Sequence, residues 1–201
     1  TLNGGRDGFL AKINSMDGSI AWATYYGGSG IDTTERIAVD QKLNIFISGS
    51  TNSTDSMATL NAYSSAFSGE FDAFLAKFTS TGVRQIGTYF GTAGDDEIFS
   101  LALDSNGNVY ATGAVTKPGN VITQTAYDNT FNGPSDGIFS KFNQMLVPLR
   151  SSYYGGNGNE LQPVLFSYGG IAVDKDNHIY LFGSTDSADS IAKPGAHKIL
   201  N

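Results

Sequence analysis

Hydrophobic and polar residues alternate over short stretches of this chain, as expected of β-strands that have one buried face. Near the N-terminus such stretches lie at residues 8–13, 19–26, 35–39 and 44–49. They are rich in aromatic and β-branched residues and are bounded by Gly, Asn or Asp, which favour turns. No segment keeps the spacing of three to four residues that marks an amphipathic helix. The pattern therefore predicts an all-β protein.

The same group of four stretches recurs along the chain with a period of about 64 residues. A strand motif that begins Asp-Gly-Phe-Leu-Ala-Lys at Asp7 returns twice, and so does a glycine-rich loop that follows a pair of aromatic residues. The strand motif lies at 7–13, 72–78 and 136–142, and the loop at 25–32, 89–96 and 153–160. A third motif, Ile-Ala-Val-Asp, begins at 37, 101 and 171, so the third copy carries extra residues within 161–169. Repetition in three registers indicates an array of repeated units.

Four antiparallel strands per repeat predict the blade of a β-propeller, with the Ile-Ala-Val-Asp strand innermost as strand a and strands b, c and d following outward. The expected fold is an all-β propeller with four-stranded antiparallel blades of about 64 residues, three blades' worth in this chain. The expected boundaries are a half-blade at 1–30, a blade at 31–94, a blade at 95–158 and a half-blade at 159–201. A β-solenoid is the main alternative, but its coils are shorter. The apolar residues of strand a are expected to be buried, namely Ile37, Val39, Leu101, Leu103, Ile171 and Val173.

Propeller rings hold four to eight blades, so three blades' worth of strands is too few to close a ring. The two half-blades would also leave unpaired strand edges, which are templates for further pairing. We therefore expect the ring to be completed by another chain or by repeats that are missing from this sequence.

Composition narrows the classes of function. The chain has no cysteine, which excludes disulfide scaffolds, thiolate zinc sites and cysteine nucleophiles. Its formal charge of −7 argues against a nucleic-acid partner, because binding to phosphates requires a basic surface. No apolar run reaches the roughly 18 residues of a membrane span. The many glycines and few charged residues fit an extracellular all-β protein.

Several segments resemble the bacterial SBBP, or beta-propeller repeat, family. They are Gly-Ile-Ala-Val-Asp, Asn-Val-Tyr-Ala-Thr-Gly, Asp-Ala-Phe-Leu-Ala-Lys and Tyr-Gly-Gly-Ser-Gly-Ile-Asp, at 170–174, 108–113, 72–77 and 26–32. The resemblance extends over essentially the whole chain and implies a propeller fold. It also implies a secreted or cell-surface bacterial protein, and the family relation specifies fold more closely than function.

The loops between strands b and c and between strands d and a should share one face of the ring, because consecutive strands are antiparallel. On that face Asp32, Asp96 and Glu160 take the same place in successive loops, and Asp95 lies beside Asp96. We treat Asp32, Asp95, Asp96 and Glu160 as candidate ligand-binding residues. Asp32, Asp96 and Glu160 are also candidate ligands of a hard cation such as Ca²⁺. Alternatively, each carboxylate accepts backbone N–H bonds and fixes its own turn.

The function expected from these observations is that of a non-catalytic, secreted or cell-surface interaction or scaffolding module. Its partner would be a protein or a carbohydrate at the face formed by the b–c and d–a loops. No catalytic residue and no resident cofactor are assigned, since acids that recur in every blade are more typical of architecture than of a single active site. The alternative is a propeller enzyme of the glycosidase or lyase type that uses carboxylates at the channel mouth.

Overall fold

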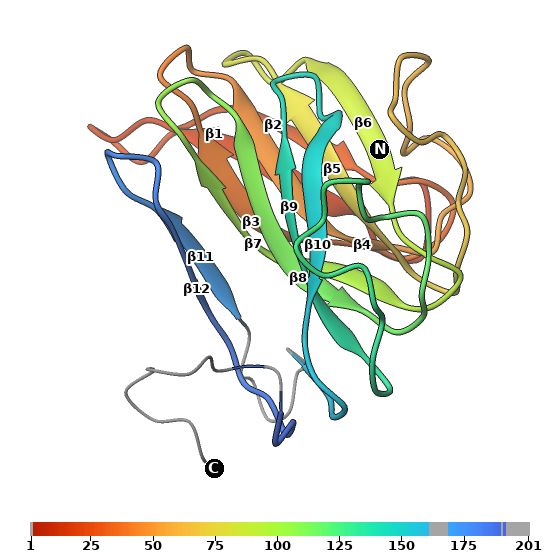
Figure 1. Ribbon diagram of the computed structural model, residues 1–201. Helices are drawn as coiled ribbons and strands as arrows, with labels where there is room; N and C mark the ends of the chain where they lie inside the picture. Colours follow the sequence, from red (N-terminus) through yellow and green to blue (C-terminus); the bar gives the residue numbers. More distant parts are fainter. Residues whose placement is uncertain (1, 161–168, 190, 192–201) are drawn as a thin grey trace.

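The computed structural model describes residues 2–160, 169–189 and 191, and this part of the chain contains twelve β-strands and no helix. Figure 1 shows the strands in chain order. The strands are β1 (Gly8–Ile13), β2 (Ile20–Tyr26), β3 (Asp32–Val39), β4 (Ile45–Thr51), β5 (Asp72–Phe78), β6 (Arg84–Phe90), β7 (Asp96–Leu103), β8 (Val109–Val115), β9 (Asp136–Phe142), β10 (Pro148–Tyr154), β11 (Gly170–Val173) and β12 (Ile179–Phe182).

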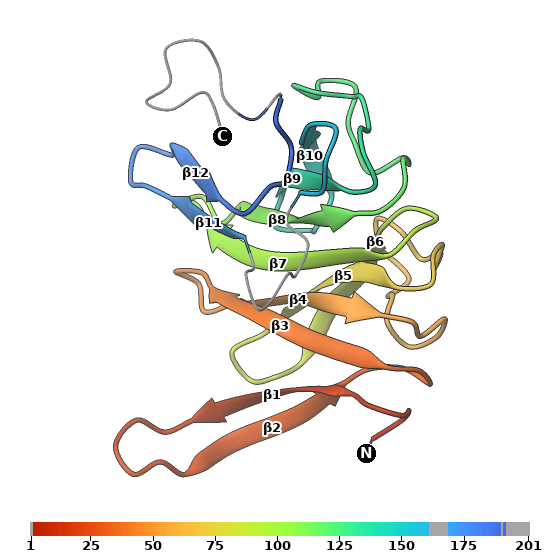
Figure 2. The same ribbon diagram turned by 90° about the horizontal axis from the view of Figure 1, so that it is seen from below.

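The strands form four antiparallel sheets that follow chain order. Strands β3 to β6 make one four-stranded sheet and β7 to β10 make a second, while β1–β2 and β11–β12 are two-stranded. Figure 2 shows the four sheets stacked face to face, with β3, β7 and β11 toward the viewer. The predicted all-β class and the four-stranded antiparallel blades are confirmed. Within the described residues the sheets do not close into a ring.

Short turns between strands a and b are held by one aspartate in each repeat. Asp40 Oδ1 accepts hydrogen bonds from the backbone N–H groups of Lys42 and Asn44, each at 2.8 Å. Asp104 and Asp174 make the same pair of bonds in their own turns. The fourth residue of each turn has a positive φ, where glycine and asparagine are least strained. That place is filled by Leu43, Gly107 and Asn177.

The hydrophobic core consists of two clusters, and each lies between neighbouring sheets. The first joins β1–β2 to the β3–β6 sheet, where Tyr26 packs against Phe74 with a ring-centroid distance of 5.2 Å. The second joins the two four-stranded sheets, where Phe90 packs edge-on against Phe142 at 5.0 Å. Face-to-face packing of this kind explains why central strands of the four-stranded sheets are buried on both faces. Every residue of β5 and of β8 is buried.

The expectation that strand a is buried throughout is wrong for Ile37 and Val39. Their side chains are 58% and 53% exposed. The corresponding residues Leu101 and Leu103 pack against the core cluster between the two four-stranded sheets, and Ile171 is buried while Val173 is half-buried. Ile37 and Val39 belong to β3, which has only the two-stranded β1–β2 sheet on its other side. The cause is therefore the missing inner half of the first blade.

Candidate functional site

The b–c and d–a loops lie together on one face, as predicted from the connectivity, because hydrogen bonds join them directly. Asp55 in the loop after β4 accepts hydrogen bonds from the backbone N–H and the hydroxyl of Ser29, at 2.8 and 2.7 Å. Ser53 Oγ accepts a bond from the N–H of Gly30 at 2.8 Å. The same links recur in the third copy, where Asp189 Oδ1 accepts from the N–H of Asn157 at 3.0 Å. Both loops are therefore held in a fixed position by polar side chains.

Asp32 is buried at the start of β3, where it anchors the glycine-rich loop. Its Oδ2 accepts hydrogen bonds from the N–H of Gly28 and the hydroxyl of Ser53, each at 2.8 Å. Its Oδ1 accepts a bond from the hydroxyl of Thr51. Both oxygens of the carboxylate are thus engaged within the two loops. This geometry favours the interpretation in which the acid fixes its own turn.

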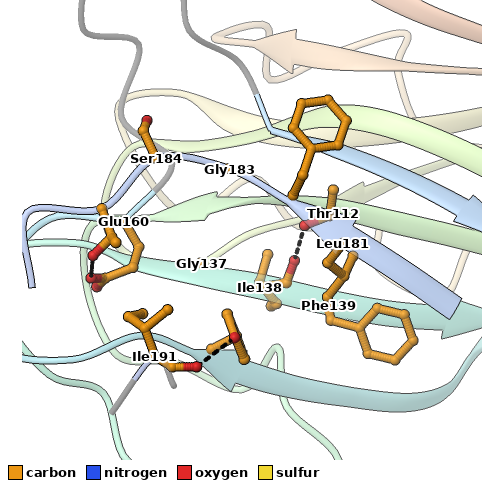
Figure 3. Close-up of a pocket in the computed structure, with 12 residues that line it drawn as sticks. Thr112, Gly137, Ile138, Phe139, Glu160, Leu181, Gly183, Ser184 and Ile191 are labelled. Atoms are coloured by element: carbon orange, nitrogen blue, oxygen red, sulfur yellow. Dashed lines mark hydrogen bonds between the residues drawn. The ribbon is translucent and has the colours of Figure 1, made fainter. Parts of the chain in front are cut away.

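Asp96 and Glu160 occupy the same place in the next two loops. Asp96 accepts hydrogen bonds from the N–H and the hydroxyl of Thr92, at 2.5 and 2.9 Å. Glu160 Oε1 accepts bonds from the hydroxyls of Thr185, at 2.7 Å, and Ser187, and Figure 3 shows Glu160 at one end of a cavity. Asp95, by contrast, is exposed. The structure places the four predicted residues in successive loops of one face.

A second acid, which the sequence analysis assigned only to strand c, faces each of these loop acids. In every repeat the first glycine after the aromatic pair passes between the two carboxylates. A Cβ built on Gly91 would lie 2.7 Å from Asp96 Oδ2 and 2.9 Å from Asp72 Oδ1. Gly27 lies in the same way between Asp7 and Asp32, and Gly155 between Asp136 and Glu160. Glycine is required here because any side chain would collide with both acids.

Three acids of these pairs are poorly solvated, which makes them harder to ionise. Burial raises the pKa of Asp96 to about 7 and that of Asp136 to about 6, and it also raises the pKa of Asp72. Asp136 Oδ1 and Glu160 Oε2 are buried without a hydrogen-bond partner. A pair of free oxygens supplies too few ligands for Ca²⁺, which takes six to eight oxygens. The arrangement suits a proton held at the pair better than a metal ion.

One group of three potential metal ligands occurs among the described residues, and it excludes the loop acids. It consists of Asp174, Asp176 and His178, whose ligand atoms lie within 4.8 Å of one another. Asp174 already accepts bonds from the N–H groups of Asp176 and His178, each at 2.9 Å, and its other oxygen contacts His178 Nδ1 at 3.0 Å. This is the same a–b turn that Asp40 and Asp104 make, with histidine in place of asparagine. The group is therefore explained by the turn.

A further acid pair, Glu35 and Glu97, lies on the inner strands and was missed by sequence reasoning. Glu35 is on β3 and Glu97 is on β7, two strands in contact with each other (Figure 2). Burial, together with a side-chain hydrogen bond and the charge of Glu35, raises the pKa of Glu97 to about 8. Glu35 lies at a β-bulge, a feature that redirects side chains near functional sites. The available signal was a break in the repeat, since Thr33 and Phe99 stand at the corresponding positions.

The raised pKa values predict that stability falls as the pH rises from about 5 to about 8. An acid whose pKa is higher in the folded state binds its proton more tightly there, so its contribution is full at low pH and is lost through the folded pKa. Each such group changes the free energy of unfolding by at most about 1.4 kcal/mol per pH unit. Thermal melts followed by circular dichroism should show a lower midpoint at about pH 8 than at about pH 5.

In the Glu97→Gln variant the loss of stability between about pH 5 and about pH 8 should be smaller, because the neutral amide has no proton to lose. The exposed Glu70→Gln is the matched control and should follow the wild-type profile. A Glu97→Gln profile as steep as that of the wild type would show that Glu97 is ionised freely in the fold.

Comparison with known protein families connects this geometry with a named repeat. The family model for the SBBP beta-propeller repeat matches residues 21–55 and 83–114. Two segments of the chain are thus similar to the SBBP beta-propeller repeat. Each matched segment runs from strand d through the glycine-rich loop to strand b. Asp32, Asp95 and Asp96 lie inside the matched segments, while Glu160 lies outside them. No curated protein matches the chain. None of the described residues lies in a helix that could cross a lipid bilayer.

Proposed function

We propose that this SBBP-repeat chain is a non-catalytic interaction module that binds a protein or a glycan at the face formed by the b–c and d–a loops. The observation that carries the proposal is a contrast within the b–c loops between anchored backbone and exposed aromatic side chains. Tyr63 and Tyr127 stand at the same place in two b–c loops and are 44% and 71% exposed. Leu60 is fully exposed nearby in sequence. Tyrosine is enriched in interfaces because its ring is apolar and its hydroxyl is polar.

The anchoring of the loops supports the same proposal. Tyr89 donates a hydrogen bond from its hydroxyl to the carbonyl of Ser53 at 2.7 Å, which ties the b–c loop to the outermost strand of its own blade. The N–H of Ser64, next to Tyr63, donates to Thr88 Oγ1 at 2.9 Å. A partner would therefore meet preorganised loops, which lowers the entropic cost of binding.

The remaining features of the proposal follow from chemistry already described. The loop acids are used in holding loops, so the module is proposed to work without a resident cofactor or calcium ion. Its net charge of −7 disfavours nucleic acid as the partner. Few charged residues and many glycines support an extracellular or cell-surface location for the module.

A glycan array and a peptide array, each probed with the labelled chain, would test the proposal. We expect binding to at least one class of ligand, with a loss of at least about tenfold in affinity in the Tyr63→Ala/Tyr127→Ala double variant, since hot-spot aromatics contribute about 2 kcal/mol or more. Thr81→Ala changes a c–d turn and serves as the control, which should bind like the wild type. Absence of binding on both arrays, or binding unaffected by the double variant, would contradict the proposal.

The Glu35–Glu97 pair favours an enzyme as a second candidate, because one of its two carboxylates is protonated near neutral pH. A glycosidase needs its two carboxyl groups about 5–10 Å apart so that the sugar fits between them. A shared hydrogen bond brings Glu35 and Glu97 closer than that, so the pair offers a protonated acid without the spacing of a glycosidase, and the enzyme stays the second candidate. If the wild-type chain hydrolysed a polysaccharide and the Glu97→Gln variant did not, this second candidate would be established in place of the first.

A further inference from the structure

Two strands whose equivalents are interior in the complete sheets, β1 and β12, lie at a sheet edge among the described residues. Strand β1 pairs with β2 alone, and β12 pairs with β11 alone. In the complete sheets the equivalents of β1, which are β5 and β9, and the equivalents of β12, which are β4 and β8, each pair on both sides. In blade terms, the described residues give β11–β12 as an inner half without strands c and d, and β1–β2 as an outer half without strands a and b. Each half has what the other is missing.

Large apolar side chains on the two halves are exposed although their counterparts in the complete blade are buried. Phe9 is 70% exposed and Tyr25 is 55% exposed, whereas the corresponding Phe74 and Tyr89 are 0% and 2% exposed. On the inner half, Tyr180 is 58% exposed, whereas its counterpart Phe46 is fully buried. The sequence has therefore kept core residues at positions that one copy of the chain leaves in solvent.

A cavity of about 230 Å³ lies between the β7–β10 sheet and the half-blade β11–β12 (Figure 3). We call the place where this half-blade would be completed the joint. Four apolar residues of its wall have exact counterparts in the cluster that joins β1–β2 to the β3–β6 sheet. Phe139, Tyr154, Leu181 and Ile191 correspond to Leu10, Tyr26, Ile47 and Met57. Even a hydrogen bond is repeated, since Tyr26 and Tyr154 donate to the carbonyls of Met57 and Ile191, each at 2.9 Å.

The cluster that joins β1–β2 to the β3–β6 sheet contains two aromatic side chains that have no counterpart in the cavity. In it, Phe74 and Tyr89 fill the space between these four residues. Their counterparts in the N-terminal half-blade are Phe9 and Tyr25, the two exposed aromatic residues. A hydrogen-bond acceptor for the second tyrosine is also present, because Tyr89 donates to the carbonyl of Ser53, whose counterpart is Ser187.

We propose that β12 of one copy of this chain pairs with β1 of a second copy, and that Phe9 and Tyr25 of the second copy fill the cavity of the first. The same joint made twice gives a two-fold ring. With the twelve strands that the described residues of each copy form, the ring has six blades, within the range that propellers adopt. This inference concerns assembly and is independent of what the loop face binds.

The register of the new strand pair follows from the two complete sheets. Ile47 lies opposite Ala76 in one sheet, and Ala111 lies opposite Ser140 in the other. The corresponding residues at the joint are Leu181 of one copy and Ala11 of the next. By the same correspondence Tyr180 lies opposite Lys12, and Thr185 lies opposite Asp7.

Charge at the joint is complementary in this register. In the β7–β10 sheet, Lys141 Nζ lies 4.9 Å from the ring centre of Tyr110 and 3.7 Å from Asp104 Oδ2. Tyr110 also donates its hydroxyl to Asp104 Oδ2 at 3.1 Å. The inner half-blade already contains the matching pair, with the hydroxyl of Tyr180 donating to Asp174 Oδ2 at 3.1 Å. Lys12 of the second copy supplies the missing cation.

The joint also covers the exposed residues of β3. Leu101 and Leu103 on β7 pack against a cluster that includes Phe46 of the preceding blade. At the joint, Ile37 and Val39 take the place of these leucines and Tyr180 takes the place of Phe46. One contact with a second copy thus buries apolar side chains on both faces of the completed blade.

Light scattering of the purified chain is the first test. We expect a species of twice 21.2 kDa for the wild type and of 21.2 kDa for Phe9→Asp, which puts a charge into the cavity. Leu60→Asp adds the same charge at a fully exposed loop residue and should leave the larger species intact. Because Phe9 is exposed within one copy, Phe9→Asp should keep the wild-type circular dichroism spectrum. A wild-type monomer, or a Phe9→Asp variant that keeps the doubled mass, would overturn the proposal.

Engineered cysteines test the register, since the chain has no cysteine of its own. Ala11→Cys mixed with Leu181→Cys should give a disulfide-linked dimer under mild oxidation, because directly opposed residues on antiparallel strands satisfy disulfide geometry. Ala11→Cys mixed with Tyr180→Cys is the control, in which the second thiol points to the opposite face of the sheet. Equal cross-linking of both mixtures would indicate unspecific edge association and would overturn the proposal. Absence of any cross-link would do the same, and would point to a partner other than a second copy.

Discussion

The Leu75→Asp variant is expected to be unfolded, whereas Val39→Asp is expected to remain folded. Leu75 is fully buried on β5, inside the cluster between the two four-stranded sheets. An unpaired charge there costs several kcal/mol, a large part of the 5–15 kcal/mol that stabilises a typical domain. Val39 is 53% exposed, so a carboxylate at this position stays in water.

Far-UV circular dichroism and urea denaturation of both variants would test this pair of predictions. A folded Leu75→Asp protein would mean that the cluster between the sheets is not the core. Loss of the folded state in Val39→Asp would mean that β3 is covered within a single copy. The Val39→Asp variant should also lose the doubled mass if the joint between copies forms as proposed.

The Phe142→Ala variant is expected to lose about 3–5 kcal/mol in the free energy of unfolding, because a buried aromatic ring is replaced by a cavity. Phe142 is fully buried and packs against Phe90. Its counterpart in the first repeat, Ile13, is 53% exposed and provides a matched control. In the Phe9→Asp background, which restricts the comparison to one copy, Ile13→Ala should change the stability by less than about 1 kcal/mol. Equal losses at the two positions, measured by urea denaturation, would contradict the assignment of the core.

The repeat made the fold predictable from sequence. The motifs that begin at Asp7, Asp72 and Asp136 mark the same strand three times, so each copy supports the assignment of the others. The a–b turns were equally predictable from the sequence, because the aspartate that opens each turn and the residue with positive φ follow local rules of backbone geometry. The face shared by the b–c and d–a loops followed from antiparallel connectivity alone.

Features that depend on packing between blades were harder to predict from the sequence. Ile37 has the sequence environment of Leu101, and only the arrangement of whole sheets shows that one is exposed and the other is packed. The pairing of Asp72 with Asp96 across Gly91 joins residues from different strands at distances that no local pattern encodes. Glu97 could have been found, because glutamate interrupts an otherwise repeated strand and a unique site must break the symmetry of the repeat.

The position of the two hydrophobic clusters has a consequence for how the chain folds. Because each cluster lies between sheets, a single blade has no interior of its own to stabilise it. The smallest unit that can fold is therefore a pair of neighbouring blades, as in other repeat proteins whose stability comes from nearest-neighbour interfaces. During synthesis each sheet would gain a stable core only once a neighbouring sheet had emerged and could pack against it.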